Sequence, residues 1–184
     1  MIRKILIALA AVIAILVVVI ALQPGDFRVE RSATLDASPA ALFEQVNDHH
    51  KFALWNPWLE LDPNVVNTYS GPESGVGAVC SWKGNSNIGA GSSTIIESKP
   101  NELVRMRMDW LEPMQGTSTV DFTFKPAADG TVVTWAMYGP QTFMGKAVSL
   151  VMDCEEMCGP QFEKGLASLG RAASSPSITA TKTP

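Results

Sequence analysis

The stretch Thr142–Arg171 constrains the fold of this 184-residue chain most, because its apolar residues recur at the spacing of one helical face. At about 100° per residue they form a single stripe. The stripe consists of Met144, Val148, Val151, Met152, Cys158, Phe162, Leu166 and Leu169. Glu155 lies inside it, and Gly159-Pro160 interrupts it, so we expect a kink or a break with a restart there. A helix with such a face needs an apolar surface to pack on.

Segments that alternate apolar and polar residues can supply that surface. The predicted strands are Phe27–Asp36, Val65–Tyr69, Val76–Lys83, Ser92–Ser98, Leu103–Trp110, Thr117–Phe124 and Thr131–Tyr138. Asp129-Gly130 is a strong hairpin signal between the last two strands. Strands with one apolar and one wet face are typical of an antiparallel sheet. We therefore predict an α+β fold in which a curved antiparallel sheet of about six to seven strands covers the long C-terminal helix.

Two short helices are expected after the first strand. Ser38 can cap a helix that begins at Pro39 and continues through Asn47. A further helical turn is predicted at His49–Leu54, and Pro57 ends it because proline cannot continue a helix.

The N-terminal segment Ile5–Leu22 is an unbroken apolar run without a charge. As a helix it would be about 27 Å long, close to the hydrocarbon thickness of a bilayer. Arg3 and Lys4 precede it, so a single-pass anchor would keep the amino terminus cytoplasmic and the domain periplasmic or extracellular. The alternative is a cleaved signal peptide, but the exit from this run lacks a clear cleavage site.

Composition and spacing argue against several classes of function. The net charge is −4 and no basic cluster follows the first four residues, which argues against nucleic-acid binding. Cys154 and Cys158 lie far in sequence from the adjacent pair His49 and His50, so we expect no metal site and no cofactor. The cysteines are expected to be buried or half-buried thiols, although a disulfide to Cys80 stays open. We expect these two histidines to be solvated side chains in a loop and not catalytic bases.

Several stretches together give the chain a family resemblance. They are Phe27–Asp48, Trp55–Pro63, Thr68–Asn85, Gly130–Gly139 and Gly159–Leu169. With the order of the predicted elements, the chain resembles the START-like, or SRPBCC, superfamily with its helix-grip fold, and more narrowly the bacterial polyketide cyclase/dehydrase-like proteins, here with a membrane anchor. The superfamily includes lipid carriers, hormone binders, aromatic polyketide cyclases and chaperone co-regulators, and it shares no catalytic residue. The resemblance implies a cavity for an apolar ligand between the sheet and the last helix.

The candidate ligand site follows from the faces of the predicted elements. Its proposed lining is Trp82, Met106, Met108, Trp110, Phe122, Trp135, Met137, Val151, Met152 and Glu155. Methionine and tryptophan side chains accommodate varied apolar shapes, although the same residues could fill a dry core. A carboxylate on an apolar face needs a partner or a raised pKa. Glu155 is therefore a weak candidate for an acid–base group, unless a rotated helix brings it to the rim beside Arg105 or Arg107.

These observations predict three parts: an anchor and linker at residues 1–26, a ligand-binding domain at residues 27–171, and a disordered tail at residues 172–184. The favoured function is binding of a hydrophobic small molecule or lipid by a membrane-tethered domain without turnover. One alternative is a cyclase or dehydratase with an acid–base residue in the same cavity. Another is a module that binds a protein partner in the cell envelope.

Overall fold

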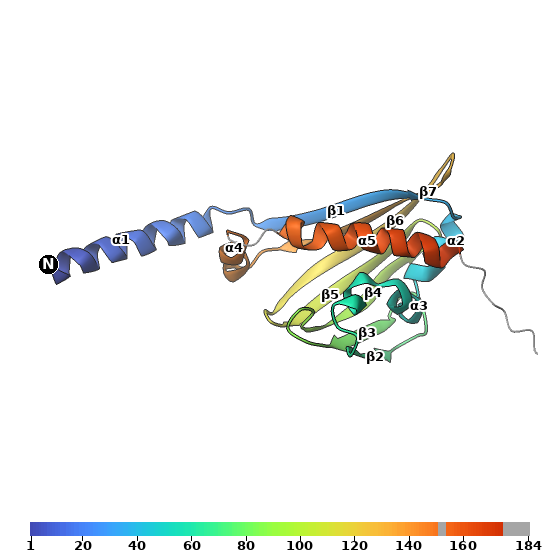
Figure 1. The fold of residues 1–184 in the computed structure, drawn as a ribbon, viewed down its shortest axis with the longest axis horizontal. Helices are drawn as coiled ribbons and strands as arrows, with labels where there is room; N and C mark the ends of the chain where they lie inside the picture. The colour runs from blue at the N-terminus through green and yellow to red at the C-terminus, as the bar shows by residue number, and fades with distance from the viewer. Residues whose placement is uncertain (151–153, 175–184) are drawn as a thin grey trace, which may run out of the picture.

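The structure is a computed structural model that describes residues 1–150 and 154–174. The elements in chain order are α1 (Ile2–Ala21), β1 (Asp26–Leu35), α2 (Pro39–Val46), α3 (His49–Trp55), η1 (Pro57–Glu60), β2 (Val66–Ser70), β3 (Val79–Lys83), β4 (Ala90–Lys99), β5 (Leu103–Glu112), β6 (Gly116–Ala127), β7 (Gly130–Pro140), α4 (Phe143–Ser149) and α5 (Cys154–Ser174). The strands form one antiparallel sheet in the order β1-β7-β6-β5-β4-β3-β2. The predicted fold class is confirmed, with seven strands (Figure 1).

The short helices begin where the capping residues predict. Ser38 accepts a hydrogen bond from the backbone N–H of Ala41, and Pro39 is the first residue of α2. Asp48 caps α3 in the same way, with its carboxylate 2.8 Å from the N–H of His50. Asn56 separates α3 from the 3₁₀ helix η1, whose first residue is Pro57. These caps fix both short helices beside α5 (Figure 1).

The stretch predicted as one C-terminal helix forms two helices. α4 ends at Ser149 and packs against α1, whereas α5 begins at Cys154 and packs mainly on β1. The two helices therefore have different packing partners. Of the kink or break expected at Gly159-Pro160, the break does not occur: α5 is one continuous helix through Pro160 to Ser174. Pro160 is exposed, so the carbonyl one turn earlier, which loses its N–H partner, can bind water instead. Most of the predicted tail, residues 175–184, lies outside the described residues.

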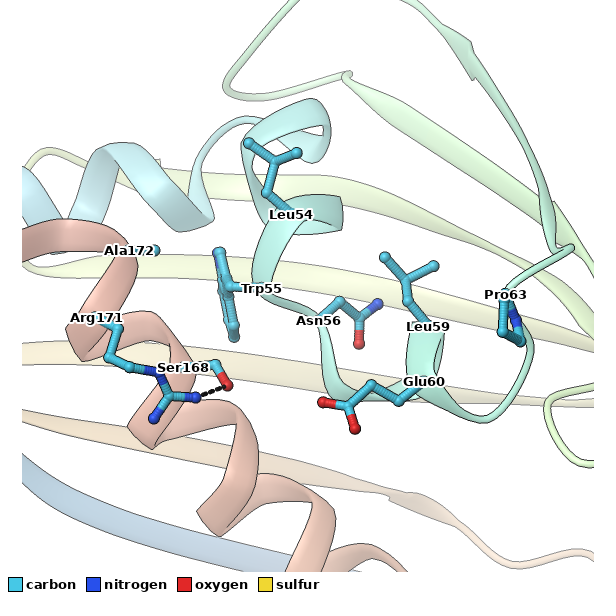
Figure 2. Close-up of a pocket in the computed structure, with 9 residues that line it drawn as sticks. All are labelled: Leu54, Trp55, Asn56, Leu59, Glu60, Pro63, Ser168, Arg171 and Ala172. Carbon is cyan, nitrogen blue, oxygen red and sulfur yellow. Dashed lines mark hydrogen bonds between the residues drawn. The ribbon is translucent and has the colours of Figure 1, made fainter. Parts of the chain in front are cut away.

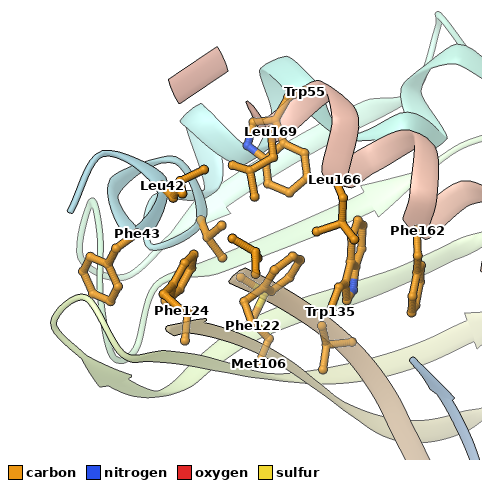
Figure 3. Packing of buried hydrophobic residues seen from close by; sticks show 14 of the residues in the cluster. Leu42, Phe43, Trp55, Met106, Phe122, Phe124, Trp135, Phe162, Leu166 and Leu169 are labelled. Atoms are coloured by element: carbon orange, nitrogen blue, oxygen red, sulfur yellow. The ribbon is translucent and has the colours of Figure 1, made fainter. Parts of the chain in front are cut away.

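The core fills the space between the inner face of the sheet and the helices α2, α3 and α5 (Figure 3). Phe162, Leu166 and Leu169 of the predicted helical stripe are all buried there. They meet aromatic and aliphatic side chains of β6 and β7, among them Phe122, Phe124, Val133 and Trp135. α5 thus covers the sheet as the apolar stripe predicts.

Candidate ligand-binding site

Inner-face residues of β5, β6 and β7 form the closed part of the predicted site. Met106, Phe122, Trp135 and Met137 are all buried. The ring of Trp135 stacks on Phe162 of α5, with centroids 4.4 Å apart and an angle of 7° between the ring planes. Phe122 lies on its other flank, with a centroid distance of 4.6 Å. These side chains are packed against one another, so at this end of the sheet they act as core.

The other end of the same inner face is less covered. Met108 and Trp110 continue β5 beyond Met106, and Trp82 lies on β3, and all three are half-buried. The rings of Trp82 and Trp110 meet edge to face with centroids 5.5 Å apart. Because Trp110 Nε1 donates to Ser118 Oγ and Trp82 Nε1 donates to the carbonyl of Ile88, both indoles are fixed in place. They present apolar surface with their polar atoms already satisfied.

Two polar side-chain atoms, one from the sheet and one from α5, are buried without a hydrogen bond to the described residues. Trp135 Nε1 and Gln161 Oε1 have no hydrogen-bond partner among the described residues. Trp135 belongs to β7 and Gln161 to α5, so one donor and one acceptor come from the two layers that face each other. A buried polar group without a partner is costly, and a bound molecule or an ordered water would remove that cost.

Glu155 is held by a cation from the first strand. Arg31 of β1 faces α5 and forms ion pairs with Glu155 and Glu163, the latter at 2.8 Å from Nε to Oε1. Gly159 lies between the two glutamates at a spacing of four residues, and a Cβ there would collide with the guanidinium of Arg31. The hydrogen bonds that the Arg31 guanidinium donates to Glu155 and Glu163 raise the pKa of Arg31. Glu155 thus lies in an exposed ion-pair network that fastens α5 to β1.

The other charged and titratable residues that the sequence singled out lie elsewhere. Arg105 is bound by Asp121 and Glu97 on the outer face of the sheet, and Arg107 by Asp109, so neither is paired with Glu155 in the ion pairs of the described residues. Cys154 and Cys158 are half-buried, as is Cys80, and no disulfide joins any of the three. A hydrogen bond with the Cys154 side chain, together with burial, raises the pKa of Cys158. Burial raises the pKa of Cys80 to about 11. Val151 and Met152 lie outside the described residues.

A hollow of about 570 Å³ on the surface of the domain was not predicted from the sequence. It is an open groove between the α3–η1 segment and the last turns of α5 (Figure 2). Its lining is Leu54, Trp55, Asn56, Leu59, Glu60, Pro63, Ser168, Arg171 and Ala172. Glu60 is paired with Lys164, and Arg171 donates to Ser168 Oγ at 2.9 Å. None of the predicted site residues lines this groove.

A second hollow, of about 390 Å³, lies between α3 and the turn after β2. His49 and His50 line it, together with Tyr69 and the loop through Glu73. His50 stacks on Tyr69 with centroids 3.9 Å apart. His49 is buried, and its Nε2 has no hydrogen-bond partner in the described part of the chain. Burial lowers the pKa of His49, while the carbonyls of Ala78 and Ser93 oppose that shift.

His49 makes the stability of the chain depend on pH. Because its folded-state pKa is below the unfolded value of about 6.5, the unfolded chain binds the proton more readily as the pH falls. We expect the free energy of unfolding to be highest above about pH 6.5 and to decrease as the pH falls below it. Urea unfolding in detergent between about pH 7.5 and about pH 5.5 measures this decrease. In His49→Gln the decrease should be smaller, and an unchanged pH dependence would contradict the assignment.

The arrangement of a curved antiparallel sheet around a long C-terminal helix, with two short helices after the first strand, defines a helix-grip fold. A family model described as polyketide cyclase / dehydrase and lipid transport matches residues 26–173. The chain belongs to this family. No curated protein matches it.

Solved structures of low sequence identity share the fold. Protein CV1439 from Chromobacterium violaceum is 17% identical, with a TM-score of 0.58 over 83% of this chain and 100% of that one. The Aha1 dimer from Colwellia psychrerythraea is 17% identical, with a TM-score of 0.55 over 80% and 96% of the two chains. The di-domain ARO/CYC BexL from the BE-7585A biosynthetic pathway is 14% identical, with a TM-score of 0.59 over 87% of this chain and 54% of that one.

Proposed function

We propose that this chain is a membrane-tethered protein that binds a hydrophobic small molecule or lipid between the sheet and α5. One observation carries the proposal: along the inner face of the sheet, burial decreases from Met106 to Met108 and Trp110. The half-buried end is apolar and aromatic, which suits a ligand without a fixed polar pattern. Membership in a family described by cyclase, dehydrase and lipid-transport activities supports the same class of ligand.

The tether rests on α1. Ile2–Ala21 is long and apolar enough to cross a membrane, and nearly all of it is exposed. The same composition fits a signal sequence near an amino terminus. We favour the anchor because the linker to β1 is short, from Leu22 to Gly25, which keeps the binding domain beside a source of apolar ligands.

Acid–base catalysis receives less support from the site. Glu155, the weak candidate for a proton-transfer group, is paired with Arg31 on the edge of the sheet–helix interface. The half-buried end of the site instead offers indoles and thioethers, which hold an apolar molecule but transfer no proton. Binding without turnover is therefore the function that we propose.

Introducing a charge at Met108 tests the site. Met108→Lys places an ammonium group among Trp82, Trp110 and the core, so we expect the affinity for an uncharged apolar fluorescent probe such as N-phenyl-1-naphthylamine to decrease by at least about tenfold, or ~1.4 kcal/mol. Titration of the detergent-solubilised full-length chain measures the affinity. The matched control is Ile96→Lys, an exposed position on β4, which should bind the probe as the wild type does. Equal loss in both variants, or in neither, would refute the site.

Native mass spectrometry of the wild-type chain extracted from its membrane tests the class of ligand. We expect a co-purifying apolar molecule that is retained by Ile96→Lys and lost from Met108→Lys.

A further inference from the structure

The end of the domain nearest to α1 exposes a group of large apolar side chains. Phe143 and Met144 of α4 are 52% and 61% exposed, and Leu150 at its end is 39% exposed. Leu111 at the end of β5 and Met114 on the turn to β6 are 57% and 43% exposed. The structure places α4 and this turn at the same end of the molecule, the end from which α1 extends (Figure 1). We call these five residues the anchor-side rim.

The helix α4 is only partly covered by the described part of the chain. It has only seven residues, Phe143–Ser149, and none of them is buried. Helices this short are marginal in water and usually depend on packing of an apolar face. Thr142 caps α4 with a hydrogen bond of 3.0 Å from the N–H of Gly145, which fixes its start but covers none of its apolar side chains. An additional apolar surface would complete its packing.

The position of α4 identifies that surface. α4 contacts α1, and Ile20, near the last turn of α1, is buried whereas the preceding residues of that helix are exposed. The N–H of Gln141, just before α4, donates to the carbonyl of Gly25 in the linker at 2.7 Å. If α1 spans a bilayer, its last turn lies where the hydrocarbon ends, and α4 must lie at the same depth.

We infer that the anchor-side rim docks on the lipid bilayer, with α4 lying in the interface and the β5–β6 turn touching it. The inference rests on the proposed tether through α1. Lys146, in the last turn of α4, can direct its ammonium toward lipid phosphates while its stem stays apolar. The half-buried residues Met108 and Trp110 precede the β5–β6 turn directly, so docking orients this end of the ligand site toward the membrane.

Photo-crosslinking of the wild-type full-length chain tests the inference. The chain is reconstituted into vesicles of phosphatidylcholine, a fraction of which carries a diazirine near the glycerol backbone, and adducts are mapped by mass spectrometry after illumination. We expect adducts in α1, on residues 143–150 and on residues 111–114. Leu54, which is 83% exposed but lies on α3, is the internal control and should remain unlabelled. Adducts in α1 alone, or equal labelling at Leu54, would overturn docking of the rim.

Two variants separate this inference from the proposed function. Phe143→Ser with Met144→Ser should lose most of the labelling of α4 and keep that of α1, because only the apolar contact of α4 is removed. Met108→Lys should lose probe binding and keep the labelling of α4. If α1 itself is unlabelled in the wild type, the tether fails and docking fails with it, whereas labelling of α1 without α4 leaves the tether intact and rejects docking alone.

Discussion

Replacing Trp135 with alanine is expected to lower the free energy of unfolding by about 3–5 kcal/mol, the largest effect of any single truncation that we predict. Trp135 is 3% exposed, and its ring is packed between Phe162 and Phe122. Trp55 and Trp58 lie against its edges, with centroids 5.9 and 5.7 Å away. Its removal leaves a cavity that the aromatic neighbours cannot fill, because they are fixed on four different elements, α3, η1, β6 and α5. Such a loss is a large part of the 5–15 kcal/mol that is typical of a folded domain.

Urea unfolding of the detergent-solubilised chain measures this loss. Leu54→Ala is the matched control, because Leu54 is a large apolar residue that is mostly exposed, and we expect a change within about 0.5 kcal/mol. Trp135→Phe provides a second test. It keeps an aromatic ring against Phe162 and removes the unpartnered Nε1, so it should cost much less than the alanine substitution. A loss below about 1 kcal/mol for Trp135→Ala would show that this ring is not central to the core.

Gly165→Ala is expected to destabilise the chain by about 1–3 kcal/mol, although alanine is normally the better residue inside a helix by about 1 kcal/mol. Gly165 of α5 lies against Trp135 and Pro57. A Cβ would be 2.5 Å from Trp135 Cζ3 and 3.2 Å from two ring atoms of Pro57. Both neighbours are buried and rigid, so the clash outweighs the gain in helix propensity.

The control for this sign reversal is Gly145→Ala in α4. There a Cβ would meet only Thr142 Oγ1 at 3.4 Å and Gln141 Cβ at 3.9 Å, which are ordinary contacts. We expect Gly145→Ala to be neutral or to stabilise the chain slightly. Thermal unfolding of both variants measures whether each substitution stabilises or destabilises the chain. Stabilisation by Gly165→Ala would mean that α5 and Trp135 are farther apart than the structure shows.

Local patterns in the sequence predicted the elements of the fold because their causes are local. Alternation along Leu103–Trp110 gives a strand with one apolar face, and Asp129-Gly130 forces the hairpin that pairs β6 with β7. Ser38 and Pro39 start α2 as their capping chemistry requires. The division of the last helical stretch into α4 and α5 was missed, because it depends on which distant element each part packs against.

Less of the candidate ligand site could be predicted from local sequence patterns. Alternation shows which face of β5 carries Met106, Met108 and Trp110, but it does not show that burial decreases along the strand, since that depends on how far α5 extends. In the sequence, Gly159 stands four residues from each of Glu155 and Glu163, which leaves space between the two acids on one face of the helix. Their common partner Arg31 lies more than one hundred residues earlier, so this spacing does not identify it. The groove between α3 and α5 likewise joins segments that are distant in sequence.

The pairing of β1 with β7 has a consequence for biosynthesis. Asp26 lies opposite Pro140 and Leu35 opposite Thr131, so the first strand after α1 pairs with the last strand to be synthesised. β1 is at the edge of the sheet and has β7 as its neighbour there. Such distant pairing makes loop closure slow. If the ribosome delivers this chain across a membrane, β1 therefore stays unpaired until β7 has emerged, and folding chaperones on that side would find it exposed until then.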